Sequence, residues 1–357
     1  MKKILLMKFR NIGDVLIMTP LLENLKLAYP DALIDVAINS GTQEMVTLNP
    51  NVNEIITYNR THIKSLDIFK RVYAEIKFAL KIRANKYDMV INTTNGDRGT
   101  QLALVSGAKL KIGYRNPKNR FLKGVFTHNL PTQELRHTLE TNLDVLRALD
   151  LPIKTKKVKI FWTKEDEVLI DNFLTCREFV HIHPISRWLF KCIKDETMAS
   201  IIDYCKMELN LEVVLTSAPI KEELDKINSI LKLCKSKPLN LSGKLSLKQT
   251  SALNKKAKFF VGVDTAIMHI SAANDTPVLA FFGPSGADHW GPWDNDLMES
   301  GYTTRRGFRS MGKHRVIQEN WDCVPCGKDG CNGTKISDCL MSLDMEFIKK
   351  NIREMRF

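Results

Sequence analysis

Acidic, hydroxyl and basic side chains recur in this sequence where short apolar runs give way to helix-like segments. The first such junction runs from Lys8 to Leu16 and reads KFRNIGDVL. Gly13 allows a tight turn from strand to helix, which would place Asp14 at the start of the helix. A carboxylate in this position can cap the helix or act as a general base. The local context by itself favours the cap.

The second junction runs from His183 to Lys191 and reads HPISRWLFK. Ser186, Arg187 and Lys191 supply a hydroxyl, a guanidinium and an ammonium just before a predicted helix. This combination suits a diphosphate, which charged donors and the free amides of a helix start can bind. A solvated basic loop would have the same composition, so both interpretations stay open here.

A third junction spans residues 215–223 and carries two adjacent glutamates. Either Glu222 or Glu223 could accept hydrogen bonds from both hydroxyls of a ribose. Glutamate is also common at the start of any helix, where it interacts with the helix dipole. The sequence does not say which of the two would contact a ligand.

A fourth junction spans residues 261–273 and reads VGVDTAIMHISAA. Asp264 and Thr265 mark a strand-to-helix turn, and the free amides that begin at Ala266 can hold a phosphate. His269 lies four residues beyond Thr265 and therefore on the same face of the helix. A lone histidine on an alanine-rich helix is usually a packing residue, but this grouping favours a binding site.

These junctions belong to a regular alternation of strands and helices. In the first half, strands are predicted at 4–9, 33–38, 55–58 and 87–92, and helices at 15–28, from about 41, and at 62–83. In the second half, strands are predicted at 179–183, 211–216, 259–263 and 277–282, and helices at 195–208, 221–233, 247–256 and 266–273. The alternation indicates βαβ units and mostly parallel sheets, whose ligands bind beyond the carboxyl ends of the strands.

The stretch around residues 150–154, which leads into several lysines, breaks this alternation, which then restarts. We therefore predict an α/β protein of two Rossmann-like, doubly wound lobes that face a central cleft. The predicted domains are residues 1–155 and 156–357, with the last helix packing back on the first domain.

The composition is that of a globular protein with a basic excess. The 357 residues include 53 Lys and Arg against 40 Asp and Glu, a net charge of +13. This excess concerns partners rather than fold, and nucleic acid, an anionic membrane and a phosphorylated substrate are all candidates. No apolar run approaches the ~20 residues of a membrane-spanning helix. We therefore expect a cytoplasmic protein.

Taken together, the four junctions resemble glycosyltransferase family 9, the ADP-heptose–lipopolysaccharide heptosyltransferases. The resemblance covers nearly the whole chain, and its strongest segments are NIGDVL at 11–16 and GVDTAIMH at 262–269. The segments RWLFK at 187–191, GPSG at 283–286 and WGPW at 290–293 are most similar to the branch that adds heptose III to the inner core.

The resemblance implies a GT-B fold with an acceptor-binding N-terminal domain and a nucleotide-sugar-binding C-terminal domain. It implies an inverting transfer without a metal or other cofactor, in which Asp14 is the catalytic base that deprotonates an acceptor hydroxyl. Implied partners are ADP-heptose, the lipopolysaccharide core–lipid A acceptor and the inner face of the bacterial inner membrane, where the enzyme would be peripheral. The expected donor-binding residues are Ser186, Arg187, Lys191, Glu222, Asp264, Thr265, Ala266 and His269.

Two other functions compete with this one. A GT-B enzyme that uses another nucleotide sugar or acceptor would carry similar junctions, and turnover with UDP- or GDP-sugars distinguishes it. A nucleic-acid-binding protein would account for the basic excess and would bind DNA or RNA in a salt-sensitive manner. It gives no reason for the turn at Asp14, and no zinc-finger or RNA-binding signature is present, so we expect no nucleic-acid partner.

Two acid-free stretches concentrate the positive charge. The first, residues 98–133, contains Arg98, Arg115 and Arg120, which we expect to contact anionic groups of the acceptor or the membrane surface. The second, residues 305–315, is a further candidate. Solvated surfaces are the alternative for both.

Four cysteines fall within seventeen residues near the C-terminus. They are Cys323, Cys326, Cys331 and Cys339. Only the first pair has the C-x-x-C spacing of zinc ligands. Reduced thiols in a packed loop are the preferred interpretation, and a structural metal is the alternative.

Overall fold

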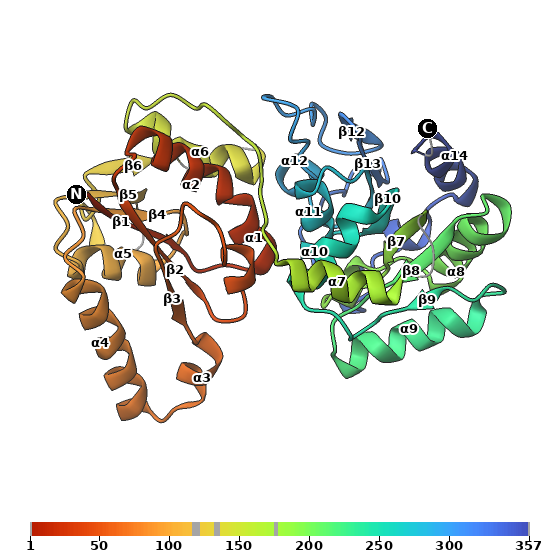
Figure 1. Cartoon of the computed structure of the whole chain (residues 1–357), viewed down its shortest axis with the longest axis horizontal. Helices are drawn as coiled ribbons and strands as arrows, with labels where there is room; N and C mark the ends of the chain where they lie inside the picture. Colours follow the sequence, from red (N-terminus) through yellow and green to blue (C-terminus); the bar gives the residue numbers. More distant parts are fainter. Residues whose placement is uncertain (1, 116–121, 132–135, 175–177, 356–357) are drawn as a thin grey trace. The chain divides into compact units, whose positions relative to one another are not determined.

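The computed structural model describes residues 2–115, 122–131, 136–174 and 178–355. It forms two compact units, Met1–Phe161 and Trp162–Phe357, and each unit is a sheet with helices on both faces (Figure 1). The division falls slightly beyond residue 155, where the sequence pattern placed it. Among the described residues, no helix is both long enough and apolar enough to span a membrane.

The N-terminal unit is built on a parallel sheet in the order β3-β2-β1-β4-β5-β6. Its strands are β1 Lys3–Lys8, β2 Leu33–Asn39, β3 Glu54–Tyr58, β4 Met89–Asn92, β5 Leu110–Tyr114 and β6 His128–Leu130. Residues Ile4 to Met7 of the central strand are fully buried, because helices cover both faces of a parallel sheet. The loops that follow β1, β4 and β5 therefore meet at one edge of the sheet.

Helices cover the two faces of this sheet in separate groups. They are α1 Ile12–Ile17, α2 Thr19–Ala28, α3 Arg60–Ser65, α4 Ile68–Ala84, α5 Asp97–Val105 and α6 Thr138–Ala148. Helix α2 packs beside α6, and α4 packs beside α5. Phe78 of α4 joins Phe9 and Tyr58 in an edge-to-face aromatic cluster that anchors α4 to the sheet.

Three helix predictions for this unit differ from the structure. The helix expected at 15–28 is interrupted at Met18, because Pro20 favours a new helix start. The helix expected at 62–83 is interrupted before Asp67, whose carboxylate caps α4 by accepting from the amides of Phe69 and Lys70. The helix expected from about residue 41 is only a 3-10 turn at Gln43–Met45.

The C-terminal unit is built on a sheet in the order β12-β13-β11-β10-β7-β8-β9. Its strands are β7 Phe179–His183, β8 Glu212–Leu215, β9 Leu239–Asn240, β10 Phe259–Val263, β11 Val278–Phe282, β12 Arg309–Met311 and β13 His314–Gln318. All neighbours are parallel except β12 and β13. The loops after β7, β8, β10, β11 and β13 consequently share one edge.

Two hydrophobic cores lie on the two sides of this second sheet. Its longer helices are α7 Lys164–Phe173, α8 Asp195–Asp203, α9 Lys221–Leu233, α10 Leu247–Lys256, α11 Ala266–Ala273 and α14 Met345–Met355. One core includes residues of α7 and α10, and the other includes residues of α8 and α14. Ile348, Ile352 and Met355 of α14, the helix expected to pack on the first domain, are buried in this second core.

Candidate active site

Asp14 follows β1 and is the third residue of α1, where it is 6% exposed. The amide of Asn11 donates to its carboxylate at 3.2 Å, and the Arg10 guanidinium lies 3.6 Å from the other oxygen. The turn itself is made by Arg10 and Asn11, whereas Gly13 lies inside the helix, which corrects the role expected for that glycine. Capping therefore fixes the orientation of the Asp14 carboxylate at the edge of the sheet.

A buried lysine that the motif analysis missed lies near this carboxylate. Lys8 donates to the Asn142 side chain at 2.8 Å and to the Thr93 carbonyl at 3.2 Å. Burial lowers the pKa of Lys8 to about 8, while the negative charge of Asp14 acts in the opposite direction. In the sequence Lys8 lies within the strand predicted at 4–9, and only tertiary packing gives it this buried position beside Asp14.

The acceptor candidates of the N-terminal unit have different environments. Arg98 is the second residue of α5 and contacts neighbours in its own unit. It forms an ion pair with Glu75 at 3.1 Å, and its guanidinium lies 4.1 Å from the centre of the Tyr58 ring. Arg115 is exposed directly after β5, at the same sheet edge as Asp14. Arg120 lies outside the described residues. Of the two candidates that the structure describes, Arg115 is thus the more exposed one.

In the C-terminal unit, Lys191 and Asp264 form an ion pair. The Lys191 ammonium lies 2.5 Å from Asp264 Oδ2, and the two side chains are 22% and 8% exposed. Lys191 ends a 3-10 turn, Leu189–Lys191, after β7, and Asp264 directly follows β10. These strands are parallel neighbours, so the second and fourth junctions of the sequence meet at one edge.

The start of α11 adjoins this ion pair. Thr265 is the N-cap of α11, and its hydroxyl is buried without a hydrogen-bond partner among the described residues. The first amides of the helix, beginning with Ala266, have no acceptor within the helix. His269 is buried one turn further along. A cation, a hydroxyl and helix-start amides at one place can bind a phosphate group.

The remaining residues of the donor prediction have distinct roles. The Glu223 carboxylate accepts from the Ala218 amide at 2.9 Å and shapes the loop after β8, whereas Glu222 is exposed. The Ser186 hydroxyl accepts from the Trp188 amide at 3.2 Å. Arg187 lies over the Trp188 ring at 5.4 Å. Glu222 is therefore the glutamate that is open to a ligand, and Ser186 shapes its own turn.

A buried histidine network, also missed in the sequence, supports this edge. His181 contacts Asn254 at 2.5 Å and Thr216 at 2.6 Å, and His183 contacts the same Thr216 hydroxyl at 2.9 Å. Burial lowers the pKa of His181 to about 4 and that of His183 to about 3, so both rings are neutral at pH 7. The network ties the ends of β7 and β8 to α10.

In the second basic stretch, residues 305–315, some of the basic side chains are paired within the unit and others are exposed to solvent. Arg315 pairs with Glu354 at 2.5 Å, and Lys313 pairs with Asp296 at 2.7 Å. Arg309 is buried and donates to the backbone carbonyls of Thr304 and Arg305. These three residues stabilise the unit rather than present charge to a ligand.

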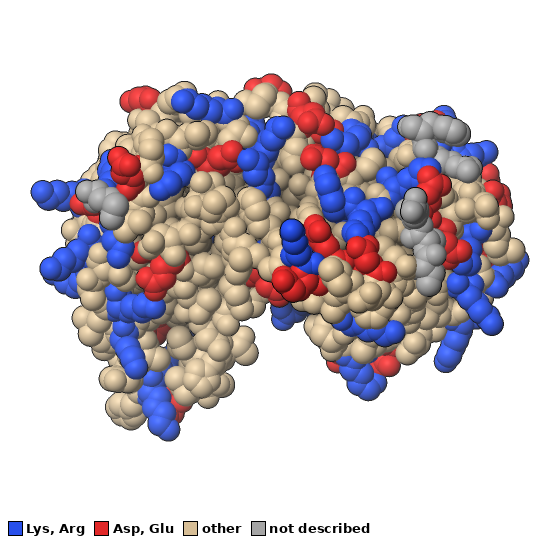
Figure 2. All heavy atoms as spheres, viewed as in Figure 1, with Lys and Arg blue, Asp and Glu red and all other residues tan. Residues whose placement is uncertain are grey.

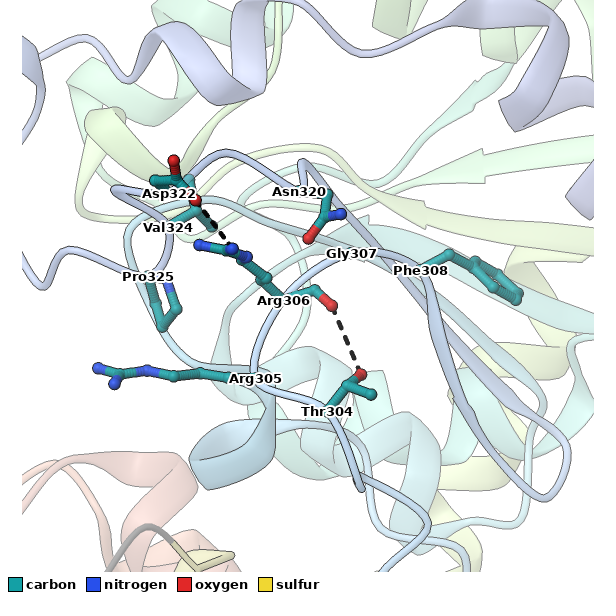
Figure 3. Close-up of a pocket in the computed structure, with 9 residues that line it drawn as sticks. All are labelled: Thr304, Arg305, Arg306, Gly307, Phe308, Asn320, Asp322, Val324 and Pro325. Carbon is teal, nitrogen blue, oxygen red and sulfur yellow. Dashed lines mark hydrogen bonds and ion pairs between the residues drawn. The ribbon is translucent and has the colours of Figure 1, made fainter.

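Arg305 and Arg306 line a cavity of about 830 Å³ (Figure 3). Arg306 pairs with the exposed Asp322 at 2.8 Å, while Arg305 has no side-chain partner among the described residues. Residues 304–308 precede β12, and Asn320 and Asp322 follow β13, so the cavity lies at the same sheet edge as Lys191. Its lining residues are Thr304, Arg305, Arg306, Gly307, Phe308, Asn320, Asp322, Val324 and Pro325.

The four cysteines near the C-terminus do not form a preorganised metal site. Within the described ranges, no group of three or more His, Cys, Asp or Glu side chains is arranged to hold a metal ion. Burial raises the pKa of the Cys339 thiol to about 12, and the other three sulfurs act in the same direction. Cys339 is accordingly a protonated packing residue, while Cys323 and Cys326 are exposed.

Comparison with known proteins identifies related chains. The family model "Glycosyltransferase family 9 (heptosyltransferase)" matches residues 76–314. Lipopolysaccharide heptosyltransferase 3 of Escherichia coli is 32% identical over 294 residues, which cover 80% of this chain and 85% of the relative.

Solved structures show the same fold. A glycosyl transferase family 9 protein from Veillonella parvula DSM 2008 has a TM-score of 0.80 at 22% identity, covering 99% of this chain and 97% of that one. The E. coli ADP-heptose lps heptosyltransferase II has a TM-score of 0.74 at 19% identity, covering 100% and 98%. At these identities the likeness concerns the fold, which is the predicted GT-B arrangement of two Rossmann-like units.

Proposed function

Because the chain belongs to glycosyltransferase family 9, the heptosyltransferase family, and is a glycosyltransferase, we propose that it transfers heptose from ADP-heptose to the inner core of lipopolysaccharide. The product is heptose III attached to heptose II, and the enzyme acts peripherally at the cytoplasmic face of the inner membrane. The likeness to heptosyltransferase 3 supports this choice of acceptor.

The observation that carries the donor assignment is the cluster at the carboxyl edge of the second sheet. The Lys191 ammonium, the Thr265 hydroxyl, which has no partner in the described part of the chain, and the start of α11 lie together there. ADP leaves with negative charge on its diphosphate, and these groups can stabilise that charge without a metal. Asp264 holds Lys191 in position, and the exposed Glu222 binds the ribose hydroxyls.

The reaction is a single inverting displacement. The acceptor hydroxyl oxygen forms a bond to the anomeric carbon as the bond from that carbon to the ADP oxygen breaks, and the hydroxyl proton passes to Asp14. The capped conformation of α1 holds the Asp14 carboxylate in one orientation, so little entropy is lost when the acceptor binds.

Anionic groups of the acceptor are assigned to the open cations. Arg115 follows β5 at the edge that carries Asp14, and Arg305 lines the cavity of the C-terminal unit without a described partner. Exposed guanidinium groups bind phosphate and carboxylate through paired donors. Arg98 does not contact the acceptor in this proposal, and it stabilises this edge of the sheet through its contacts with Glu75 and Tyr58.

Asp14→Asn tests the proposed base, because asparagine can still accept from the Asn11 amide but cannot take a proton at neutral pH. We expect kcat to fall by about 10²–10⁴-fold, with the affinity for ADP-heptose changed less than about twofold. Mass spectrometry of a core-truncated lipopolysaccharide should show one added heptose with the wild type. Near-normal turnover by Asp14→Asn would remove it as the base.

Asp166→Asn is a matched control for the capping role. Asp166 is also the third residue of its helix, α7, and its carboxylate accepts from the Thr163 amide at 3.0 Å. We expect this variant to keep wild-type turnover. Parallel assays with UDP- and GDP-sugars test the donor, and faster turnover with either would replace ADP-heptose in the proposal.

A further inference from the structure

Helix α4 has a face of large apolar side chains that no part of the described chain covers. Spacings of four residues place these side chains on one side of the helix. We call this set the α4 face: Ile68, Phe69, Val72, Tyr73, Ile76 and Leu80, which are 64%, 84%, 50%, 68%, 53% and 57% exposed. Single exposed apolar residues are ordinary, but a contiguous row of this kind marks an interaction surface.

The α4 face is not the side that packs on the sheet. Phe78, together with Ala74 and Ala79, packs against the core of the N-terminal unit, and Ile82 is buried. Glu75 accepts from the Tyr58 hydroxyl at 2.6 Å. The helix is therefore held by one side, and its other side presents apolar surface to the surroundings.

The charges around the α4 face favour an anionic partner. Residues 60–84 contain seven Lys and Arg against two carboxylates, Asp67 and Glu75. Both carboxylates are occupied within the chain, Asp67 as the cap of α4 and Glu75 by Tyr58 and Arg98. In the space-filling view, blue side chains lie beside tan surface in the region where Figure 1 shows α3 and α4 (Figure 2).

Three lysines lie along one margin of the α4 face. Lys70, Lys77 and Lys81 are separated by seven and four residues, so they form a row beside the apolar side chains. All three are exposed, although Lys70 lies 3.3 Å from Asp67 and Lys81 lies 3.3 Å from Glu54 in ion pairs at the surface, which anionic headgroups would have to share. A helix with an apolar side that includes aromatic rings and a margin of lysines is typical of helices that lie in the interface of an anionic membrane.

The topology also places this surface near the proposed acceptor site. Because α4 follows β3 and leads back to β4 in a parallel sheet, its first residues lie toward the edge that carries Asp14. Arg98, at the start of α5 on that edge, contacts Glu75 of α4 directly. An acceptor anchored in lipid could therefore reach this edge while its lipid part stays in the bilayer.

We propose that the α4 face binds the surface of a bilayer that contains anionic lipid, with the apolar side chains inserted among the acyl chains and Lys70, Lys77 and Lys81 at the headgroups. This proposal rests on the proposed function at one point, which is that the acceptor of the reaction is anchored in lipid. The binding itself requires neither donor nor acceptor.

Vesicle flotation of the full chain tests the proposal. We expect wild-type protein to float with phosphatidylcholine vesicles that contain one quarter phosphatidylglycerol, and at least tenfold less with phosphatidylcholine alone. Phe69→Ser with Ile76→Ser should lower binding to the anionic vesicles at least tenfold. Lys70→Gln with Lys77→Gln should lower it severalfold and reduce its dependence on salt.

Val168→Ser with Met207→Ser is the matched control, because these side chains of the C-terminal unit are 59% and 61% exposed. This control should bind vesicles as the wild type does. Unchanged binding by the Phe69 and Ile76 variant, or equal loss by the control, would overturn the proposal. Sedimentation velocity without lipid tests the alternative that the α4 face contacts a second copy of this chain. If the wild type is a dimer that only the Phe69 and Ile76 variant dissociates, and vesicle binding is unchanged, the face is a contact between two copies and the proposal is overturned.

Activity assays separate this proposal from the proposed function. The Phe69 and Ile76 variant should keep wild-type kcat on a deacylated, water-soluble acceptor and show a raised KM on acceptor embedded in vesicles. Equal loss on both acceptors would overturn the assignment of the face to membrane binding. If the wild-type protein binds vesicles through α4 but transfers no heptose, the proposed function is wrong and the assignment of the α4 face to membrane binding is unaffected.

Discussion

The Lys191 ammonium lies 2.5 Å from Asp264 Oδ2, although the two residues are 73 positions apart in the sequence. They meet because β7 and β10 are parallel neighbours and the loops after them share an edge. Asp264 balances the charge of Lys191 and holds the ammonium beside the start of α11. A diphosphate that binds there must share or displace this ion pair.

Removing Lys191 should weaken donor binding. A charge-assisted hydrogen bond is worth about 1.5–3 kcal/mol, so we expect Lys191→Ala to raise the Kd for ADP-heptose by about 10- to 150-fold in calorimetric titration. Lys221→Ala is the control, because its ammonium also lies 2.5 Å from a carboxylate, that of Asp225, but on an exposed helix surface. An unchanged Kd for Lys191→Ala would remove this residue from the donor site.

Acidification should destabilise the C-terminal unit through His181 and His183. Burial lowers the pKa of these rings to about 4 and about 3, whereas in the unfolded chain they titrate near 6.5. Below pH 6.5 the unfolded state therefore binds more protons than the folded state. As the pH is lowered, the free energy of unfolding decreases by up to about 1.4 kcal/mol per pH unit for each ring. The stabilising contribution is complete above pH 6.5 and is lost progressively toward pH 3.

Urea unfolding at pH 7, 6, 5 and 4.5 measures this slope. In His181→Gln, whose side chain does not titrate, the slope should be smaller than in the wild type, even though its stability at pH 7 is lower. The exposed His62 offers a control, since His62→Gln should leave the slope unchanged. A wild-type stability that is flat from pH 7 to 4.5 would contradict the neutral buried network.

The buried Arg309 guanidinium should be essential for stability, unlike its exposed neighbour Arg305. Arg309 donates to the carbonyls of Thr304 and Arg305 and to the Gln318 side chain. Arg309→Met leaves the buried Gln318 side chain and the two part-buried carbonyls without this donor, at an expected cost of about 1–3 kcal/mol in the free energy of unfolding. Arg305→Met should change stability by less than about 0.5 kcal/mol. Equal effects in urea unfolding would contradict this division of roles.

Much of the fold follows from local patterns in the sequence. The predicted strands 179–183 and 259–263 and the predicted helices 221–233, 247–256 and 266–273 agree with the structure to the residue. These segments have short apolar runs or a clear helical period, bounded by polar residues. The predictions failed where a single residue favours the start of a new helix, as Pro20 and Asp67 do, because the apolar periodicity continues across both interruptions.

The candidate site could be predicted only in part. The sequence identified Asp14, Lys191, Asp264 and Thr265, because each stands at a strand-to-helix junction. It could not show that Glu223 is used by its own loop while Glu222 is open, since the two glutamates are adjacent and chemically identical. It also missed Lys8, His181 and His183, whose roles depend on burial.

The sequence by itself determined the order of the βαβ units and the residue types at their junctions, because hydrophobic period and turn residues are local properties. Tertiary structure decided which junctions meet, since strand order brings β7 beside β10 and so joins Lys191 to Asp264. Tertiary structure also decided which charged side chains are paired within the chain. Whether an arginine such as Arg98 or Arg309 can bind a ligand depends on the neighbours that packing places beside it.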